Sequence, residues 1–162
     1  MTAKIPFERA IRDHGATVLR VCRAVLGAGP DADDAWSETF LAALRHWPDL
    51  DDDTNVEAWL VRVAQRKAVD MTRARSRQAV SSAEVPDRPS TEASGDDVWQ
   101  AVAELPPRQR LAIAYHYLGG LPHAETAELI GGTAASVRRA ASDGITSLRR
   151  TYLAADREKS SS

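Results

Sequence analysis

The sequence predicts an all-α protein made of two small helical domains joined by a flexible linker, the second domain containing a helix-turn-helix. Three observations support this prediction. Apolar residues recur at helical spacing on both sides of a central stretch, no segment alternates with the period of a strand, and the stretch itself is rich in Ser, Pro and acidic residues. The length of 162 residues, with 43% hydrophobic and 27% charged residues, fits two small globular domains.

Three helices are expected in the first domain, residues 1–78. The first helix covers Ile5 to Leu26 and ends at a Gly- and Pro-rich segment, since both residues interrupt helices. Asp31 is expected to cap the second helix, which stops near Trp47, and Thr54 or Asn55 to cap a third that runs to about Arg77. The apolar residues expected on the second and third helices are Ala35, Trp36, Phe40, Leu41 and Leu44, followed by Val56, Trp59, Leu60, Val63 and Ala64.

Residues 79–95 are expected to form the linker, and residues 96–155 the second domain. Its first helix begins at Asp96 or Asp97 and is interrupted at Pro106-Pro107, and the next ends at Gly119-Gly120. The last seven residues, 156–162, are expected to be a disordered tail.

A helix-turn-helix pattern covers residues 123–144. Ala127 is small enough for two helices to cross, Gly131 suits a turn with positive φ, and Val137 is placed to enter the core. The second helix of such a unit usually lies in the major groove of DNA. Here it begins near Thr133 and presents Ser136, Arg138 and Arg139. An ordinary helical hairpin with a solvated face is the alternative.

Charge is distributed in two adjacent blocks of opposite sign. Residues 31–57 contain nine acidic residues and one basic residue, a net of −8, whereas residues 62–77 contain six basic residues and one acidic residue, a net of +5. The basic block suits phosphate neutralisation, although a solvated helix face has the same composition. The acidic block is better suited to docking on a basic protein than to catalysis or metal binding, because its carboxylates lie in the first turns of an exposed helix.

Nothing in the sequence indicates an enzyme, a metal site or a cofactor. The four histidines His14, His46, His116 and His123 lack metal-ligand spacing, and no nucleophile or phosphate-loop motif occurs. Cys22 is the only cysteine, which suits a reducing compartment, and it is expected to be buried. No apolar run reaches the length of a membrane span and the first residues lack a signal-peptide core, so we expect a cytoplasmic protein without membrane insertion.

Taken in order, three stretches resemble the extracytoplasmic-function (ECF) class of bacterial RNA polymerase sigma factors. DADDAWSETFLAALRHW (31–47) resembles the polymerase-binding helix of this class, and EAWLVRVAQRKAVDMTRARSR (57–77) its promoter-melting helix that reads the minus-ten element. LPPRQRLAIAYHYLGGLPHAETAELIGGTAASVRRA (105–140) resembles the domain that binds the minus-thirty-five element. The resemblance implies core RNA polymerase and promoter DNA as partners, and it leaves open whether an anti-sigma factor exists.

The resemblance also implies roles for individual residues. Those implied to contact polymerase are Asp33, Asp34, Trp36, Glu38 and Phe40. Those implied to face the minus-ten element are Arg62, Arg66, Lys67, Arg73, Arg75 and Arg77. Those implied to read the minus-thirty-five element are Thr133, Ser136, Arg138 and Arg139. By analogy, the linker, with a net charge of −4 over residues 79–97, threads near the nucleic-acid channels of polymerase.

The chain departs from the family pattern in two segments. Asp143 and Gly144 follow the recognition segment where basic residues are usual, and both are expected to weaken it, since Asp repels phosphate and Gly disfavours helix. Arg66 lies where the family usually has Asn. Two other functions are therefore kept as alternatives, a stand-alone DNA-binding regulator and a regulatory interaction protein with weakened DNA reading.

Overall fold

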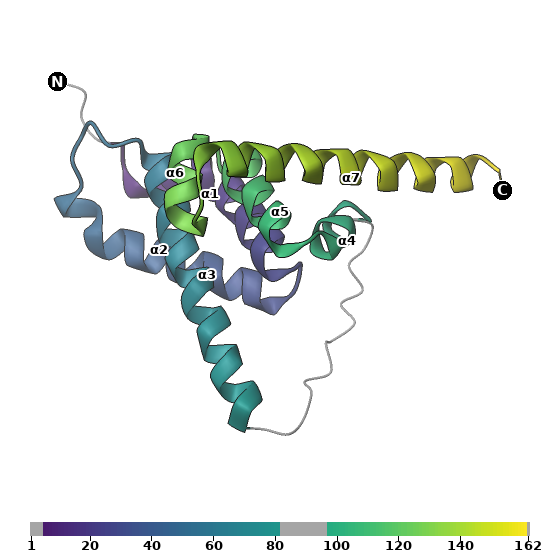
Figure 1. Ribbon diagram of the computed structural model, residues 1–162. Coiled ribbons are helices and arrows are strands. Elements are labelled where there is room, and N and C mark those ends of the chain that lie inside the picture. Colours follow the sequence, from purple (N-terminus) through teal and green to yellow (C-terminus); the bar gives the residue numbers. More distant parts are fainter. Residues whose placement is uncertain (1–4, 82–96, 162) are drawn as a thin grey trace.

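The structure, a computed structural model, describes residues 5–81 and 97–161, and every regular element in these ranges is helical. Module one contains α1 (Phe7–Leu26), α2 (Pro30–His46), the 3-10 helix η1 (Trp47–Asp49) and α3 (Val56–Ser81). Module two contains α4 (Asp97–Glu104), α5 (Pro107–Ala112), the π-helical turn η2 (Ile113–Leu118), α6 (His123–Ile130) and α7 (Ala134–Ser160). The far ends of α3 and α7 project from the body of the molecule in different directions (Figure 1). Among the described residues no helix is long and apolar enough to cross a membrane.

The all-α prediction is confirmed, but several predicted boundaries are wrong. Residues 79–81, expected in the linker, form the last turn of α3, and the rest of that segment lies outside the described residues. The tail expected to be disordered from residue 156 continues α7 as far as Ser160. Arg157, Glu158 and Lys159 explain the difference, because Arg, Glu and Lys are good helix formers.

Caps define the starts of two functionally important helices. The Asn55 side-chain oxygen accepts a hydrogen bond from the Ala58 amide at 3.2 Å, as expected for an N-cap of α3. Asp31 was wrongly predicted as the cap of α2. Gly29 occupies the N-cap there, Pro30 is the first helical residue and Asp31 lies in the first turn. Pro is favoured at this position because it has no amide hydrogen to leave unpaired.

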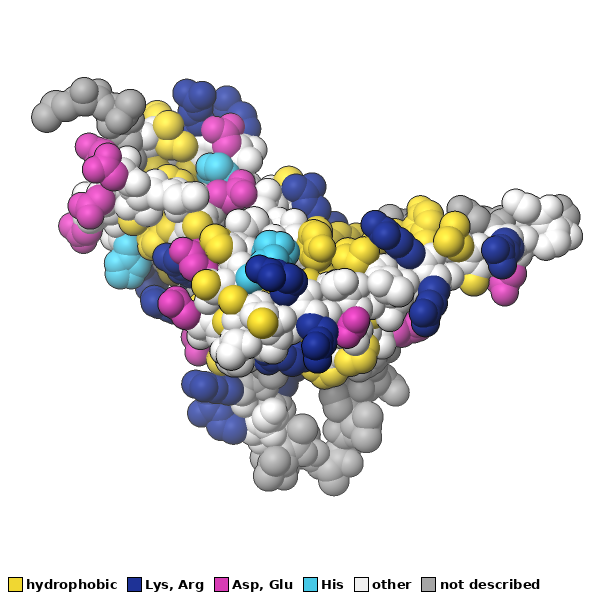
Figure 2. Space-filling view, turned by 45° about the horizontal axis from the view of Figure 1, so that its top comes forward, with side chains coloured by type: hydrophobic (Ala, Val, Ile, Leu, Met, Phe, Trp, Pro, Cys, Tyr) yellow, Lys and Arg dark blue, Asp and Glu magenta, His cyan; other side chains and the backbone are white. Residues whose placement is uncertain are grey.

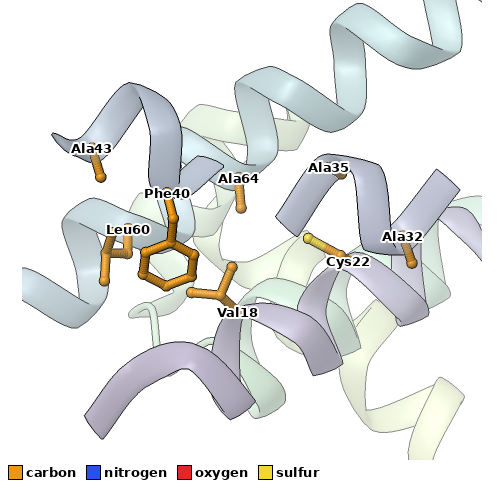
Figure 3. Close-up of a cluster of buried hydrophobic side chains, with 8 residues drawn as sticks. All are labelled: Val18, Cys22, Ala32, Ala35, Phe40, Ala43, Leu60 and Ala64. Atoms are coloured by element: carbon orange, nitrogen blue, oxygen red, sulfur yellow. The ribbon is translucent and has the colours of Figure 1, made fainter. Parts of the chain in front are cut away.

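The core of module one lies between α1, α2 and α3. Val18 and Cys22 of α1, Phe40 of α2 and Leu60 of α3 are 5% exposed or less, and small residues of α2 and α3 allow the helices to approach (Figure 3). Phe40 points into this core, and its ring centroid lies 4.7 Å from that of Trp36. Burial of these side chains is the main stabilising contribution to the module.

The core of module two joins the helix-turn-helix to α5. Ala127 of α6 and Val137 of α7 are buried together with Ala112 of α5, as the helix-turn-helix pattern predicts. Gly131, between the two helices, has φ of +88°, a conformation that glycine adopts without strain. Next to this core, η2 is widened by a hydrogen bond from the Gly119 amide to the Ala114 carbonyl, five residues earlier, at 2.9 Å.

The two modules pack directly against each other, a relationship about which the sequence patterns gave no indication. Val21 and Val61 of module one form a buried cluster with Tyr115 and Leu121 of module two. A second cluster joins Ala24 of α1 to Val102 of α4 and Ala114 of η2. At the same interface, a Cβ atom on Gly119 would lie 2.9 Å from a methyl carbon of Val61, so only glycine fits there.

Candidate nucleic-acid interface

Thr133 sets the start of α7. Its side-chain oxygen accepts a hydrogen bond from the Ser136 amide at 3.1 Å, and the Ser136 hydroxyl oxygen accepts one from the Thr133 amide at 3.0 Å. This reciprocal capping box satisfies two amide groups that an uncapped helix would leave unpaired. Thr133 is thus the N-cap, and the first turn of α7 lies at the exposed end of the helix-turn-helix.

Arg138 and Arg139 lie on the exposed side of the next turn of α7, one residue beyond the buried Val137. Two arginines near the N-terminus of the second helix of a helix-turn-helix are placed where base edges are read. Ser136 differs from them, because its hydroxyl already takes part in the capping box. Arg138 and Arg139 are therefore the side chains of the predicted set that are best placed to meet DNA.

The basic residues predicted on the third helix all lie on α3. Arg73, Arg75 and Arg77 are exposed in its projecting part, Arg66 is exposed nearer the body, and Lys67 is half-buried. In Figure 2, Lys and Arg side chains gather near the projecting end of α3 and also along α7. Each module therefore carries exposed basic side chains.

Two of the α3 arginines are engaged in ion pairs. Arg62 forms one with Glu125 of α6 at 2.9 Å, across the contact between the modules, and its side chain is 43% exposed. Arg75 pairs with Asp31 of α2 within module one. The position of Arg62 beside module two distinguishes it from the other predicted minus-ten residues, because Glu125 of module two would compete with a polyanion for its charge.

The acidic residues predicted for polymerase binding lie on the solvent side of α2. Asp33, Asp34 and Glu38 are all exposed. Trp36 and Phe40, predicted in the same set, differ from these acidic residues because Trp36 is half-buried and Phe40 is buried. Phe40 is 5% exposed in the core, and the Trp36 indole donates a hydrogen bond to the Gly15 carbonyl at 2.9 Å. Both side chains hold α2 against α1, and their predicted contact with polymerase stays a prediction.

Two other apolar residues of α2, Leu41 and Leu44, are exposed to solvent. Leu41 is 57% and Leu44 is 52% exposed, although their spacing had suggested core positions. They continue the line that begins at Asp34 and Glu38, since residues three or four apart share a helix face. The exposed face of α2 thus presents acidic residues in its first half and two leucines in its second.

The histidines lie at separate places in the described part of the chain, apart from one stacked pair. His116 and His123 stack with ring centroids 3.7 Å apart, and His14 lies 3.1 Å from Glu57, but no group of three potential ligands occurs among the described residues. Desolvation, the neighbouring His116 and the charge of Arg138 lower the pKa of His123. Burial raises the pKa of the Cys22 thiol to about 12, as expected for an unreactive core cysteine.

Comparisons with known proteins match both modules to one family. Sigma-70 region 2 matches residues 10–78, and Sigma-70 region 4 matches residues 95–148. The chain is 31% identical over 151 residues to the ECF RNA polymerase sigma factor ShbA of Streptomyces griseus, and the match covers 81% of this chain and 79% of ShbA. It is 30% identical over 144 residues to the ECF RNA polymerase sigma factor BldN of Streptomyces coelicolor, covering 82% of this chain. The match spans only 54% of the length of BldN.

Solved structures share the arrangement of the helices. The sigma factor RpoE of Bartonella quintana, solved in complex with the anti-sigma factor NepR, superimposes with a TM-score of 0.73 at 19% identity, over 91% of this chain and 96% of RpoE. CnrH, solved in complex with the cytosolic domain of CnrY, gives a TM-score of 0.61 at 23% identity, over 91% of this chain and 88% of CnrH. At these identities the two likenesses show the fold.

Proposed function

Because this chain belongs to the family of ECF RNA polymerase sigma factors, we propose that it binds core RNA polymerase, directs it to promoters and helps to open the DNA at the start site. The observation that carries the DNA-binding part of this proposal is the capped start of α7, where Arg138 and Arg139 are exposed. A bidentate contact from one such arginine to guanine contributes about 1–3 kcal/mol of discrimination. The role requires no catalytic group or cofactor, and its site of action would be the cytoplasm.

Polymerase binding is assigned to the exposed face of α2. Asp33, Asp34 and Glu38 would attract a basic surface, while Leu41 and Leu44 would supply the apolar contact that charges alone do not provide. The RpoE structure contains an anti-sigma factor. A protein of that kind acting on this chain would compete with polymerase if it covered the same α2 face.

Minus-ten recognition is assigned to the basic side of α3. The exposed arginines of its projecting part, together with Arg66 and Lys67, would neutralise phosphates while unstacked bases of one strand are captured. Unstacking costs a few kcal/mol per base, and contacts to the exposed strand would offset this cost.

In the packed arrangement of the modules, the two proposed DNA-reading surfaces lie too close together to contact both promoter elements. We call this arrangement the closed state. Elements centred at minus ten and minus thirty-five are separated by about 25 base pairs, or roughly 85 Å of B-DNA. The whole of α3 spans only about 39 Å, and module two is packed against its first turns at Val61 and Arg62. The modules must therefore separate before both elements can be read at once, and the same step would free Arg62 from Glu125.

The test is co-purification with core RNA polymerase followed by run-off transcription from the promoter of the chain's own operon. A complex that yields a discrete transcript supports the proposal. Absence of polymerase binding would contradict it and favour a DNA-binding regulator that acts alone, whereas binding that yields no transcript from any promoter would favour a regulatory interaction protein.

A further inference from the structure

Arg108 reaches from α5 to the turn of the helix-turn-helix. It lies in the first turn of α5, and its Nη2 donates hydrogen bonds to the Gly131 carbonyl at 2.9 Å and to the Ser136 hydroxyl oxygen at 2.8 Å. The three residues come from α5, from the turn and from the first turn of α7. A single guanidinium group thus joins the three parts of the module that set where α7 begins.

The turn contains two glycines, and one of them, Gly132, leaves space for the guanidinium group of Arg108. Gly131 and Gly132 both have positive φ, near +88° and +89°, which favours glycine at each position. Gly132 is also constrained by space, because a Cβ atom there would overlap the Arg108 guanidinium and lie 2.7 Å from the Ser136 hydroxyl oxygen. A side chain at position 132 would therefore displace Arg108 even if the backbone were tolerated.

Ser136 has no hydrogen-bonding capacity left for a DNA base. Its hydroxyl donates to the Thr133 carbonyl at 2.9 Å and accepts from the Thr133 amide at 3.0 Å and from Arg108. One donor and two acceptors are all that a hydroxyl offers. Ser136 was predicted to read the minus-thirty-five element, but its hydroxyl group bonds to Thr133 and to Arg108 instead.

Within this first turn, Val137 is the residue that packs into the core. A cleft of about 500 Å³ separates the turn from α5, lined among others by Arg108, Ser136 and Arg139. Gly132, Thr133 and Ala135 are exposed, and the first buried residue of α7 is Val137. The hydrogen bonds of Arg108 therefore link α5 to the exposed side of this turn, which the packing of Val137 does not reach.

We propose that Arg108 is a positioning residue for promoter recognition, which fixes the first turn of α7 so that Arg138 and Arg139 approach the bases at one angle. This inference rests on the proposed role of α7 in reading DNA. A positioning residue differs from a simple phosphate contact in what its loss changes. Loss of a positioning residue lowers the preference for the correct DNA sequence, whereas loss of a phosphate contact lowers the affinity for every sequence alike.

The test measures binding of the full chain to two duplexes over a range of salt concentrations. One duplex carries the minus-thirty-five element of the promoter identified by run-off transcription, and the other carries the same bases scrambled. We expect Arg108→Ala to reduce the ratio of the two affinities by about five- to tenfold, a share of what a bidentate arginine contributes. Arg108→Lys should not restore the ratio, because lysine keeps the charge but lacks the planar fork of donors.

Arg149→Ala is the matched control, since it removes the same charge from an exposed position on α7 far from the turn. It should leave the affinity ratio unchanged. If Arg108→Lys keeps the wild-type ratio, and Arg108→Ala merely weakens both duplexes with a salt slope reduced by about 1, the positioning role is wrong and Arg108 is a phosphate contact.

A double-mutant cycle with Gly132→Ala gives a second, independent test. If Gly132→Ala displaces Arg108, removing Arg108 as well should cost no further discrimination, so the double variant should match Gly132→Ala alone. Additive losses would contradict the proposal. Failure of the wild-type chain to discriminate between the duplexes would overturn the recognition role of α7 itself, whereas wild-type discrimination that persists in Arg108→Ala overturns only the positioning role.

Discussion

Gly144 of α7 lies so close to Ile113 of η2 that a Cβ atom at position 144 would be 2.5 Å from Cδ1 of Ile113 and 3.3 Å from its Cγ1. The sequence had suggested that this glycine weakens the recognition helix. In the structure it allows α7 to pack closely on the middle of module two, where Ile113 is 3% exposed. The packing gained at this contact offsets the low helix propensity of glycine.

Gly144→Ala should therefore destabilise the protein, although alanine is the better helix former. Overpacking costs about 1–3 kcal/mol and the gain in helix propensity is about 1 kcal/mol, so we expect a net loss of about 1 kcal/mol in the free energy of unfolding by urea. Asp143→Ala, at the neighbouring exposed position, is the control and should not destabilise. A Gly144→Ala variant more stable than wild type would show that the contact with Ile113 relaxes freely.

Asp34→Arg should weaken binding to core RNA polymerase by about tenfold without changing the stability of the chain. The side chain is exposed in the first turns of α2, and charge reversal there opposes a basic partner. Affinity is measured by titration of labelled chain with polymerase. Asp52→Arg makes the same change at an exposed loop position and should have little effect. Equal losses for both variants would point to general electrostatic attraction rather than to the α2 face.

Arg138→Ala should leave polymerase affinity unchanged and weaken promoter-specific transcription. Loss of one base contact of about 1–3 kcal/mol corresponds to a decrease of roughly 5- to 150-fold in affinity for the minus-thirty-five element. Run-off transcription at limiting DNA, together with the polymerase titration, separates the two effects. If Arg138→Ala instead loses polymerase and Asp34→Arg does not, the two surfaces have been assigned the wrong way round.

Glu125→Arg should favour separation of the modules. It replaces the partner of Arg62 with a like charge, and because the pair is partly exposed we expect an effect of about 1 kcal/mol, or up to about fivefold in affinity for promoter DNA. Energy transfer between dyes on the two modules measures the separation directly. Glu128→Arg, one turn further along α6 at an exposed position, adds the same charge and is the control. Unchanged energy transfer in Glu125→Arg would show that the apolar cluster alone holds the closed state.

Stability should fall as the pH is lowered from about 7 to about 5.5, and His123 should contribute to the fall. Its pKa is lowered in the folded chain, so over this range the unfolded chain binds more protons and acid favours unfolding. His123→Gln should flatten the dependence measured by urea unfolding at a series of pH values. The exposed His46 provides the control variant, His46→Gln, and an identical slope for wild type and His123→Gln would exclude this role.

Local signals were sufficient to predict the helices and the start of α7. Asn55 and Thr133 cap their helices through residues only three positions away, so the sequence window contains both partners. The helix-turn-helix was predictable for the same reason, since Ala127, Gly131 and Val137 act within one short unit.

What could not be predicted depends on residues far apart in the chain. The apolar residues of α2 cover a wide part of its circumference, so their spacing in the sequence does not reveal which of them contact α1. In the structure Phe40 is buried, whereas Leu41 and Leu44 are exposed. The role of Gly144 depends on Ile113, and the bond from Arg108 to Ser136 spans 28 residues. The packing of Val61 on Tyr115 crosses the whole linker, and no local pattern encodes it.

The helix α1 contributes to the cores of both modules, with Val18 and Cys22 in one and Val21 and Ala24 in the clusters shared with the other. This sharing limits how modular the protein is in evolution and in engineering. In a chimera that joined residues 5–81 to the second half of a relative, Val21 and Ala24 would pack well only if the relative carried suitable side chains at the positions of Tyr115 and Ala114. When second halves are exchanged among such proteins, the residues of α1 that contact module two, Val21 and Ala24, therefore have to be exchanged with them.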